Sequence, residues 1–155
     1  MSSASFSILG LKEIKTKLQT LPDEVSKKAV RTSLRKAAKL VRDAAYNNAL
    51  AVDDPNTGRK IADNIRLQFA SRLFQQTNGE LVMFRVGVST SRGNIPTPNA
   101  DTGPRGSTPH WHLVEFGTQK NKSKPFMRPA LDNNVSQVID SFVINLGQEL
   151  DNLFK

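Results

Sequence analysis

Residues 109–131 read PHWHLVEFGTQKNKSKPFMRPAL, and they decide how the end of this chain is attached to the rest. This stretch holds the only Trp and both His, together with three of the eight Pro and two of the eight Phe. Large anchoring side chains and rigid prolines are therefore concentrated in one short connection. Such a composition predicts a segment that clamps a C-terminal helix onto a hydrophobic core.

The backbone preferences of this stretch predict its local structure. Gly117 follows an apolar run and can adopt a positive φ without steric cost, so it suits the end of a helix or strand. Pro125 restricts the residue before it to extended conformations, and Pro129 fits the first turn of a new helix. We expect Phe126 and Met127 to fold under the domain. A solvated loop is predicted for the segment that holds Lys120, Lys122 and Lys124.

A signature within this stretch resembles that of a known family. It consists of Leu113, Val114, Glu115, Phe116, Gly117 and Thr118, followed at short range by Pro125, Phe126, Met127, Arg128, Pro129 and Ala130. It is similar to the neck and tail-completion proteins of long-tailed bacteriophages, the tail-component family typified by gene product ten of a lambda-like phage. A clamp that only fastens the last helix would explain the same residues without the family.

The resemblance implies a structural virion protein and not an enzyme. Six copies would form a ring at the head–tail junction, as a neck or tail-completion protein assembled in the host cytoplasm. The ring would join the tail tube to the head connector, next to the tail terminator, and DNA would pass through its channel without sequence-specific binding. One alternative is a tail-terminator ring subunit. An alternative of a different class is a basic nucleic-acid-binding protein.

The resemblance also implies roles for individual residues of the signature. Phe116 and Phe126 are expected to be anchors, either in the core or in an interface. Glu115 is expected to pair with a cation, such as Arg128 or an arginine of a neighbouring copy. The alternative for Glu115 is a plain surface carboxylate.

Length and composition indicate a single domain over residues 1–155, with enough apolar residues for one modest core. No apolar run approaches the roughly 20 residues that a membrane span needs, and the N-terminus lacks the pattern of a secretory signal. Cys is absent, so disulfides and thiol chemistry are excluded. The net charge of +8 is uneven, because residues 129–155 hold four acids and one lysine. This polarity suits head-to-tail packing of copies, and equally a position near nucleic acid.

Apolar residues at helical spacing predict three helices. The first holds Leu11, Ile14, Leu18 and Leu21 and stops at Pro22. The second is long, opens at Asp23 and Glu24, and ends before a turn-rich loop at 51–58. The third is a continuous stripe from Pro129 that includes Leu131, Val135, Val138, Ile139, Phe142, Val143, Leu146, Leu150 and Leu153.

Five cations follow the second helix at steps of three and four residues, so they share one face. This basic stripe consists of Lys28, Arg31, Arg35, Lys39 and Arg42. It is either a solvated face, a contact for an acidic protein surface, or a contact for nucleic acid. Because a cationic channel would hold DNA back, we expect Arg31, Arg35 and Arg42 to face protein or solvent.

The middle of the chain predicts a small antiparallel sheet of two strands, with room for three or four. Residues 60–65 fit a short helical turn, and residues 65–69 and 81–88 fit strands. Asn78 and Gly79 form a strong hairpin signal between these strands. Residues 89–109 predict a long flexible loop, which either orders when partners dock or is a surface insertion without a role.

The chemistry that an enzyme needs is missing from the sequence. His110, His112 and Glu115 could contribute to a metal site, but no further His or Cys completes a ligand set. No nucleophile motif and no phosphate-binding glycine loop is present. We therefore expect no catalytic residues, no metal and no cofactor. The predicted fold is α+β, with N-terminal helices, a small antiparallel sheet and a C-terminal helix packed on the sheet.

Overall fold

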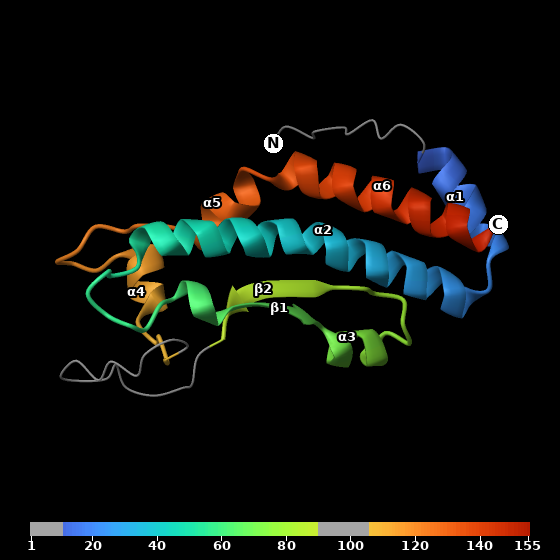
Figure 1. Cartoon of the computed structure of the whole chain (residues 1–155). Coiled ribbons are helices and arrows are strands. Elements are labelled where there is room, and N and C mark those ends of the chain that lie inside the picture. The colour runs from blue at the N-terminus through green and yellow to red at the C-terminus, as the bar shows by residue number, and fades with distance from the viewer. Residues whose placement is uncertain (1–10, 90–105) are drawn as a thin grey trace.

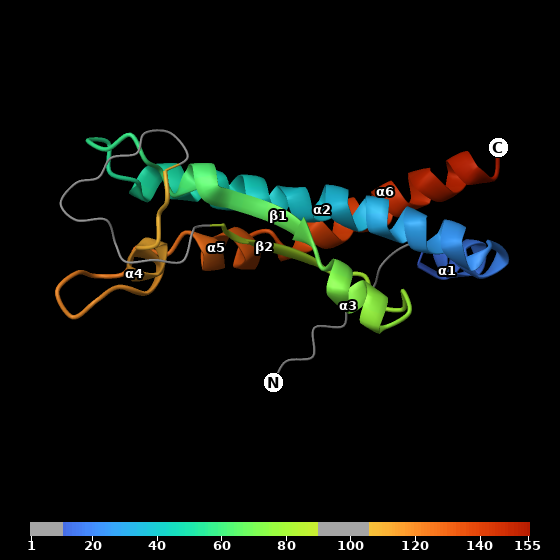
Figure 2. The same cartoon turned by 90° about the horizontal axis from the view of Figure 1, so that it is seen from below.

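The computed structural model describes residues 11–89 and 106–155. These residues fold into three layers (Figure 1). The elements are α1 (Leu11–Thr20), α2 (Asp23–Val52), the 3-10 turn η1 (Ala62–Asn64), β1 (Ile65–Phe69), α3 (Ser71–Gln76), β2 (Phe84–Val88), α4 (Trp111–Phe116), α5 (Met127–Asp132) and α6 (Val135–Leu153). The α+β class is confirmed. One detail differs: α2 lies between the sheet and α6, so the C-terminal helix packs mainly on α2 instead of on the sheet (Figures 1 and 2).

The long helix α2 organises the other elements. It begins directly after Pro22, with two acids in its first turn, and it runs two residues into the predicted 51–58 loop. Its buried residues recur at every fourth position: Ala29, Ser33, Ala37, Val41, Ala45 and Ala49. Four of these six are Ala, so other helices can approach closely along this row. The single polar member, Ser33, donates its hydroxyl hydrogen to the Ala29 carbonyl at 2.9 Å.

The sheet consists of β1 and β2 in antiparallel register, with Leu67 opposite Val86. The predicted hairpin at Asn78 and Gly79 is wrong. Both residues do have positive φ, at 52° and 80°, but they end helix α3. The Gly79 N–H donates to the Phe74 carbonyl at 2.7 Å, which is a helix C-terminal bond and not a strand-to-strand bond.

The predicted continuous C-terminal helix is interrupted. It divides into α5 and α6 at Asn133 and Asn134. The Asn134 side chain donates to the Ala130 carbonyl at 2.9 Å, and short polar side chains of this kind compete with regular helical bonding. The break lets α5 and α6 take different directions along α2 (Figure 1).

Two apolar clusters stabilise this arrangement. The larger one surrounds the C-terminal half of α2 and consists of Val41, Ala45, Ala49, Ile61, Ala62, Ile65, Phe126 and Ala130. The smaller one lies near the other end and consists of Ala29, Leu146 and Leu150, with Ile14 and Leu18 of α1 packed against it. Each buried Leu, Ile or Phe contributes about 1.5–3 kcal/mol relative to an exposed one.

Part of the predicted 89–109 loop can be described. The Asn64 side chain donates to the Gly106 carbonyl at 2.8 Å and to the Thr108 hydroxyl at 2.9 Å, so the end of the loop is tied to the body. The remainder, residues 90–105, lies outside the described residues, as do residues 1–10. Among the described helices, none combines the length and the apolar composition of a membrane span.

Candidate functional site

The signature residues lie in α4, in α5 and at the two ends of the loop that connects these helices. Gly117 ends α4 with φ 78° and ψ 178°, and its N–H donates to the Leu113 carbonyl at 2.9 Å. A Cβ at this position would lie 2.7 Å from the Ser123 nitrogen, so only glycine fits. The Lys124 N–H donates to the Val114 carbonyl at 2.8 Å. The lysine-containing loop is therefore bonded back onto α4 at both ends.

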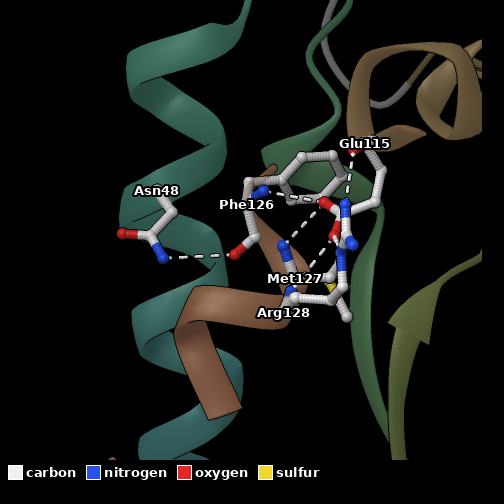
Figure 3. Close-up of polar contacts among 5 residues, drawn as sticks. All are labelled: Asn48, Glu115, Phe126, Met127 and Arg128. Atoms are coloured by element: carbon white, nitrogen blue, oxygen red, sulfur yellow. Dashed lines mark hydrogen bonds and ion pairs between the residues drawn. The ribbon is translucent and has the colours of Figure 1, made fainter. Parts of the chain in front are cut away.

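Glu115 is the buried centre of this arrangement, with 1% of its surface exposed. Its Oε2 accepts the N–H groups of Phe126 at 2.7 Å and Met127 at 2.9 Å. Its Oε1 accepts the N–H of Arg128 and the Nε–H of the same residue, both at 3.2 Å. Figure 3 shows the carboxylate facing the first residues of α5. We call Glu115 together with these donors the Glu115 clamp.

The clamp satisfies groups that a helix start leaves without partners. The first N–H groups of a helix have no intrahelical acceptor, and a carboxylate is favoured there by the helix dipole. Asn48 of α2 donates to the Phe126 carbonyl at 3.1 Å, so α2 is bonded to the same segment (Figure 3). The clamp thus joins α4 to α5, and Asn48 joins α5 to α2.

The ionisation of Glu115 follows from a competition. Burial alone opposes the charged form, but the N–H groups of Met127, Phe126 and Arg128 and the Arg128 side chain outweigh it. The pKa of Glu115 therefore lies below its ordinary value. Of the expectations for this residue, contact with Arg128 agrees with the structure, and the plain surface carboxylate is wrong.

The two phenylalanines of the signature have different environments. Phe126 is fully buried in the larger apolar cluster. Phe116 is 63% exposed, and the Arg128 guanidinium lies over its ring at 5.3 Å from the centroid. Phe116 is thus no core residue of its own subunit, and a role in an interface stays a prediction. Of the other members, Ala130 is fully buried, Leu113, Val114, Met127 and Pro129 are partly buried, and Thr118 and Pro125 are exposed.

The basic stripe lies on α2 beside the sheet. Lys28, Arg31, Arg35 and Lys39 are exposed and Arg42 is half-buried. The Arg31 guanidinium lies over the Phe69 ring of β1 at 5.4 Å. Three stripe members, Arg35, Lys39 and Arg42, line an open groove between α2 and β1, and Arg66 of β1 adds a further cation there. The exposed position of Arg66 follows from the alternation of residues 65–69, but no local signal could place it beside α2.

The two histidines lie at the start of α4. Within residues 11–89 and 106–155, no group of three or more His, Cys, Asp or Glu side chains could hold a metal ion. His112 is exposed and packs its ring edge-on against Trp111. His110 is half-buried. Burial is the main cause that lowers its pKa, and the nearby positive charge of Arg59 lowers it further. The His110 imidazole is thus partly packed beside α4, whereas the His112 imidazole lies at the surface.

Comparison with known proteins identifies the family. A family model described as "Bacteriophage HK97-gp10, putative tail-component" matches residues 12–117. The match includes α4 and Gly117, while Pro125–Ala130 follow it. No curated protein and no solved structure matches the chain. Because the family model covers more than half of the sequence, this chain belongs to the HK97-gp10-like family of bacteriophage tail components.

Proposed function

We propose that the chain is a structural subunit of a ring at the head–tail junction of a long-tailed phage. Six copies would join the tail tube to the head connector, as a neck or tail-completion protein, beside the tail terminator. The family match supports a tail component, and the proposed role is structural and without a catalytic reaction. The ring would be assembled in the host cytoplasm, reside in the virion, and leave a channel for DNA.

The observation that carries this proposal is the exposed pair of Phe116 and Arg128. Aromatic residues and arginine are enriched in protein interfaces and dominate their binding energy. Phe116 ends α4 and Arg128 lies in α5, and both elements are held by the buried Glu115. A large exposed ring on a rigid base loses little side-chain entropy when a partner covers it. The pair is therefore suited to contact a neighbouring copy or tail protein.

The test is electron microscopy of the purified chain mixed with tail tubes from the phage that encodes it. We expect rings at tube ends with the native chain and loss of rings with Phe116→Ala, because removal of an interface hot spot costs about 2 kcal/mol or more. The matched control is Phe154→Ala, which removes another exposed aromatic ring, 52% exposed, near the C-terminus. A native chain that never joins tubes or connectors would contradict the proposal.

The same micrographs separate the proposal from the tail-terminator alternative. A terminator would cap bare tubes and stop their growth, whereas a completion ring would add to tubes that are already capped. In either case the DNA passes through the channel unbound. We propose that Arg31, Arg35 and Arg42 face protein or solvent, since a cationic channel would retard the duplex.

The second candidate function, a nucleic-acid-binding protein, is favoured by the groove cations. Its test is a titration of the isolated chain with duplex DNA at two salt concentrations. Tight binding with a log–log salt slope of roughly −0.9 per phosphate neutralised would support it. Weak binding by the monomer, together with ring formation on tubes, would support the structural role.

A further inference from the structure

The groove between α2 and β1 is open, basic and about 680 Å³ in volume. We call it the basic groove, and its charged lining residues are Arg35, Lys36, Lys39, Arg42, Asp63 and Arg66. It brings five cations together with one carboxylate. Lys36 turns toward α6, where it pairs with Glu149 at 2.9 Å, and Arg42 pairs with Asp43 at 3.1 Å.

Three groove cations have no ion pair among the residues that the structure describes: Arg35, Lys39 and Arg66. Clustered cations of like sign repel one another, and this repulsion is relieved when an acidic partner binds. The partly buried side chains of Leu67 and Tyr46 lie among them and add apolar surface, so a partner that carries an acid beside an apolar residue would match the groove.

Such a surface is present on the opposite side of the same subunit. The outer strip of α6 carries the exposed residues Gln137, Asp140, Ile144 and Gln148 at helical spacing, and Ile144 is 60% exposed. Asp140 has no ion pair within the described ranges, whereas Glu149 and Asp151 pair with Lys36 and Lys17 of their own subunit. Asp132 and Leu131 of α5 add an exposed acid and an exposed apolar residue nearby in the chain.

The position of these two surfaces fits a repeating contact. The sheet and α6 lie on opposite sides of α2 (Figures 1 and 2). Two different patches on opposite sides of a subunit form a heterologous contact, which closes into a ring when the rotation allows it. We infer that the basic groove of one copy receives the outer strip of α6 from the next copy. This inference rests on the proposed ring and assigns its contact surfaces.

Cross-linking tests the contact, and the absence of native Cys makes it specific. One chain carries Arg66→Cys in the groove, the other Ile144→Cys on α6, and a short bismaleimide joins them after mixing. Lys122→Cys is the matched control for the groove variant, since it also replaces an exposed cation. We expect a yield of mixed dimer roughly ten times that of the control, falling at high salt. Equal yields would overturn the inference.

Charge reversal then separates direct contact from general attraction. Arg35→Glu in the groove chain should lower the yield several-fold, and Asp140→Arg in the α6 chain should restore it when the two are combined. Failure of this rescue would overturn the inference. The inference would also be overturned if duplex DNA abolished the cross-link while Asp140→Arg left the cross-linking yield unchanged. If rings form on tail tubes but the groove and α6 do not cross-link within them, this inference fails and the proposed function stands.

Discussion

The two ends of α2 are held to the rest of the chain in different ways. At the C-terminal end, a buried carboxylate and a fully buried aromatic ring attach α5, and Asn48 bonds to the same segment. At the N-terminal end, α1 and α6 are held by the smaller apolar cluster and by ion pairs at the surface, such as Lys17 with Asp151 at 2.7 Å. Buried polar contacts are costly to break, whereas exposed ion pairs are screened by water.

Single residues therefore specify the fold at the C-terminal end of α2, whereas many small contacts support it at the N-terminal end. The Glu115 clamp fixes the direction of α5 by several bonds to one carboxylate, so a single change disturbs all of them. The opposite end depends on many small contributions, so single changes there are tolerated. We therefore expect the effect of mutation to decrease from the clamp toward α1, and the following changes test that order.

The largest effect is expected for Phe126→Ala. This ring is fully buried in the larger apolar cluster, and removing a buried Phe costs about 3–5 kcal/mol through lost burial and a cavity. Urea unfolding followed by circular dichroism measures the change, with Phe154→Ala as an exposed control. A loss below about 1 kcal/mol would mean that the clamp segment is not part of the cooperative core.

Gly117→Ala should be the next most damaging change. With φ 78° and ψ 178°, this residue occupies a region that is essentially restricted to glycine, at a cost of roughly 1–3 kcal/mol for other residues. The added Cβ would also press on the Ser123 nitrogen, 2.7 Å away. Gly147→Ala is the control, because its Cβ would meet nothing within 4 Å and Ala favours the helix. Equal stability of the two variants would contradict the geometry of the loop.

Glu115→Gln retains the shape of the side chain and removes its charge. The amide leaves N–H groups of the α5 start poorly bonded, so we expect a loss of about 2 kcal/mol at neutral pH. Glu149→Gln, which changes the exposed ion pair with Lys36, is the matched control and should leave the unfolding midpoint almost unchanged. Similar losses of unfolding free energy in the two variants would contradict the difference between the two ends of α2.

The pH dependence of stability should report the same carboxylate. Because the pKa of Glu115 is lower in the folded state than its ordinary value of 4.5, its contribution is complete above that value. It disappears as the pH falls through the folded-state pKa. The difference in unfolding free energy between the native chain and Glu115→Gln should therefore narrow in acid, as measured by urea unfolding from pH 7 downward. A constant difference would show that Glu115 is not ionised in the fold.

The difference between the two ends of α2 also explains which parts of the fold the sequence predicts. The helices α1, α2 and α6 and the strand β1 follow from apolar periodicity, which local sequence carries directly. Asn78 and Gly79 wrongly indicated a hairpin turn, because a positive φ suits the end of a helix as well as a hairpin. The sequence does not predict the break at Asn133 and Asn134, because asparagine also occurs inside helices. Packing on α2 could equally have continued the helix through both residues.

The contacts of the site join residues that are not neighbours in the sequence, so local sequence patterns do not predict them. Glu115 binds N–H groups 11 to 13 residues further along the chain, across a folded loop, and no spacing rule covers such a bond. The resemblance to the phage family indicated that the residue mattered, and its contact with Arg128 was one of the expected alternatives. Arg66 joins the groove only because β1 runs beside α2.

The smallest effect is expected for Lys17→Ala, at the end of the molecule opposite the clamp. Lys17 bonds to Asp151 at 2.7 Å and to Glu13 at 3.0 Å, which raises its pKa, yet both carboxylates are more than half exposed. Water and salt screen such pairs, and ordering long side chains opposes the gain. The unfolding midpoint in urea should therefore barely change, and it should be equally insensitive to added salt in the native chain. A marked loss in low salt that added salt abolishes would instead show that electrostatics fix α1 on α6, and the two ends of α2 would then be held with comparable strength.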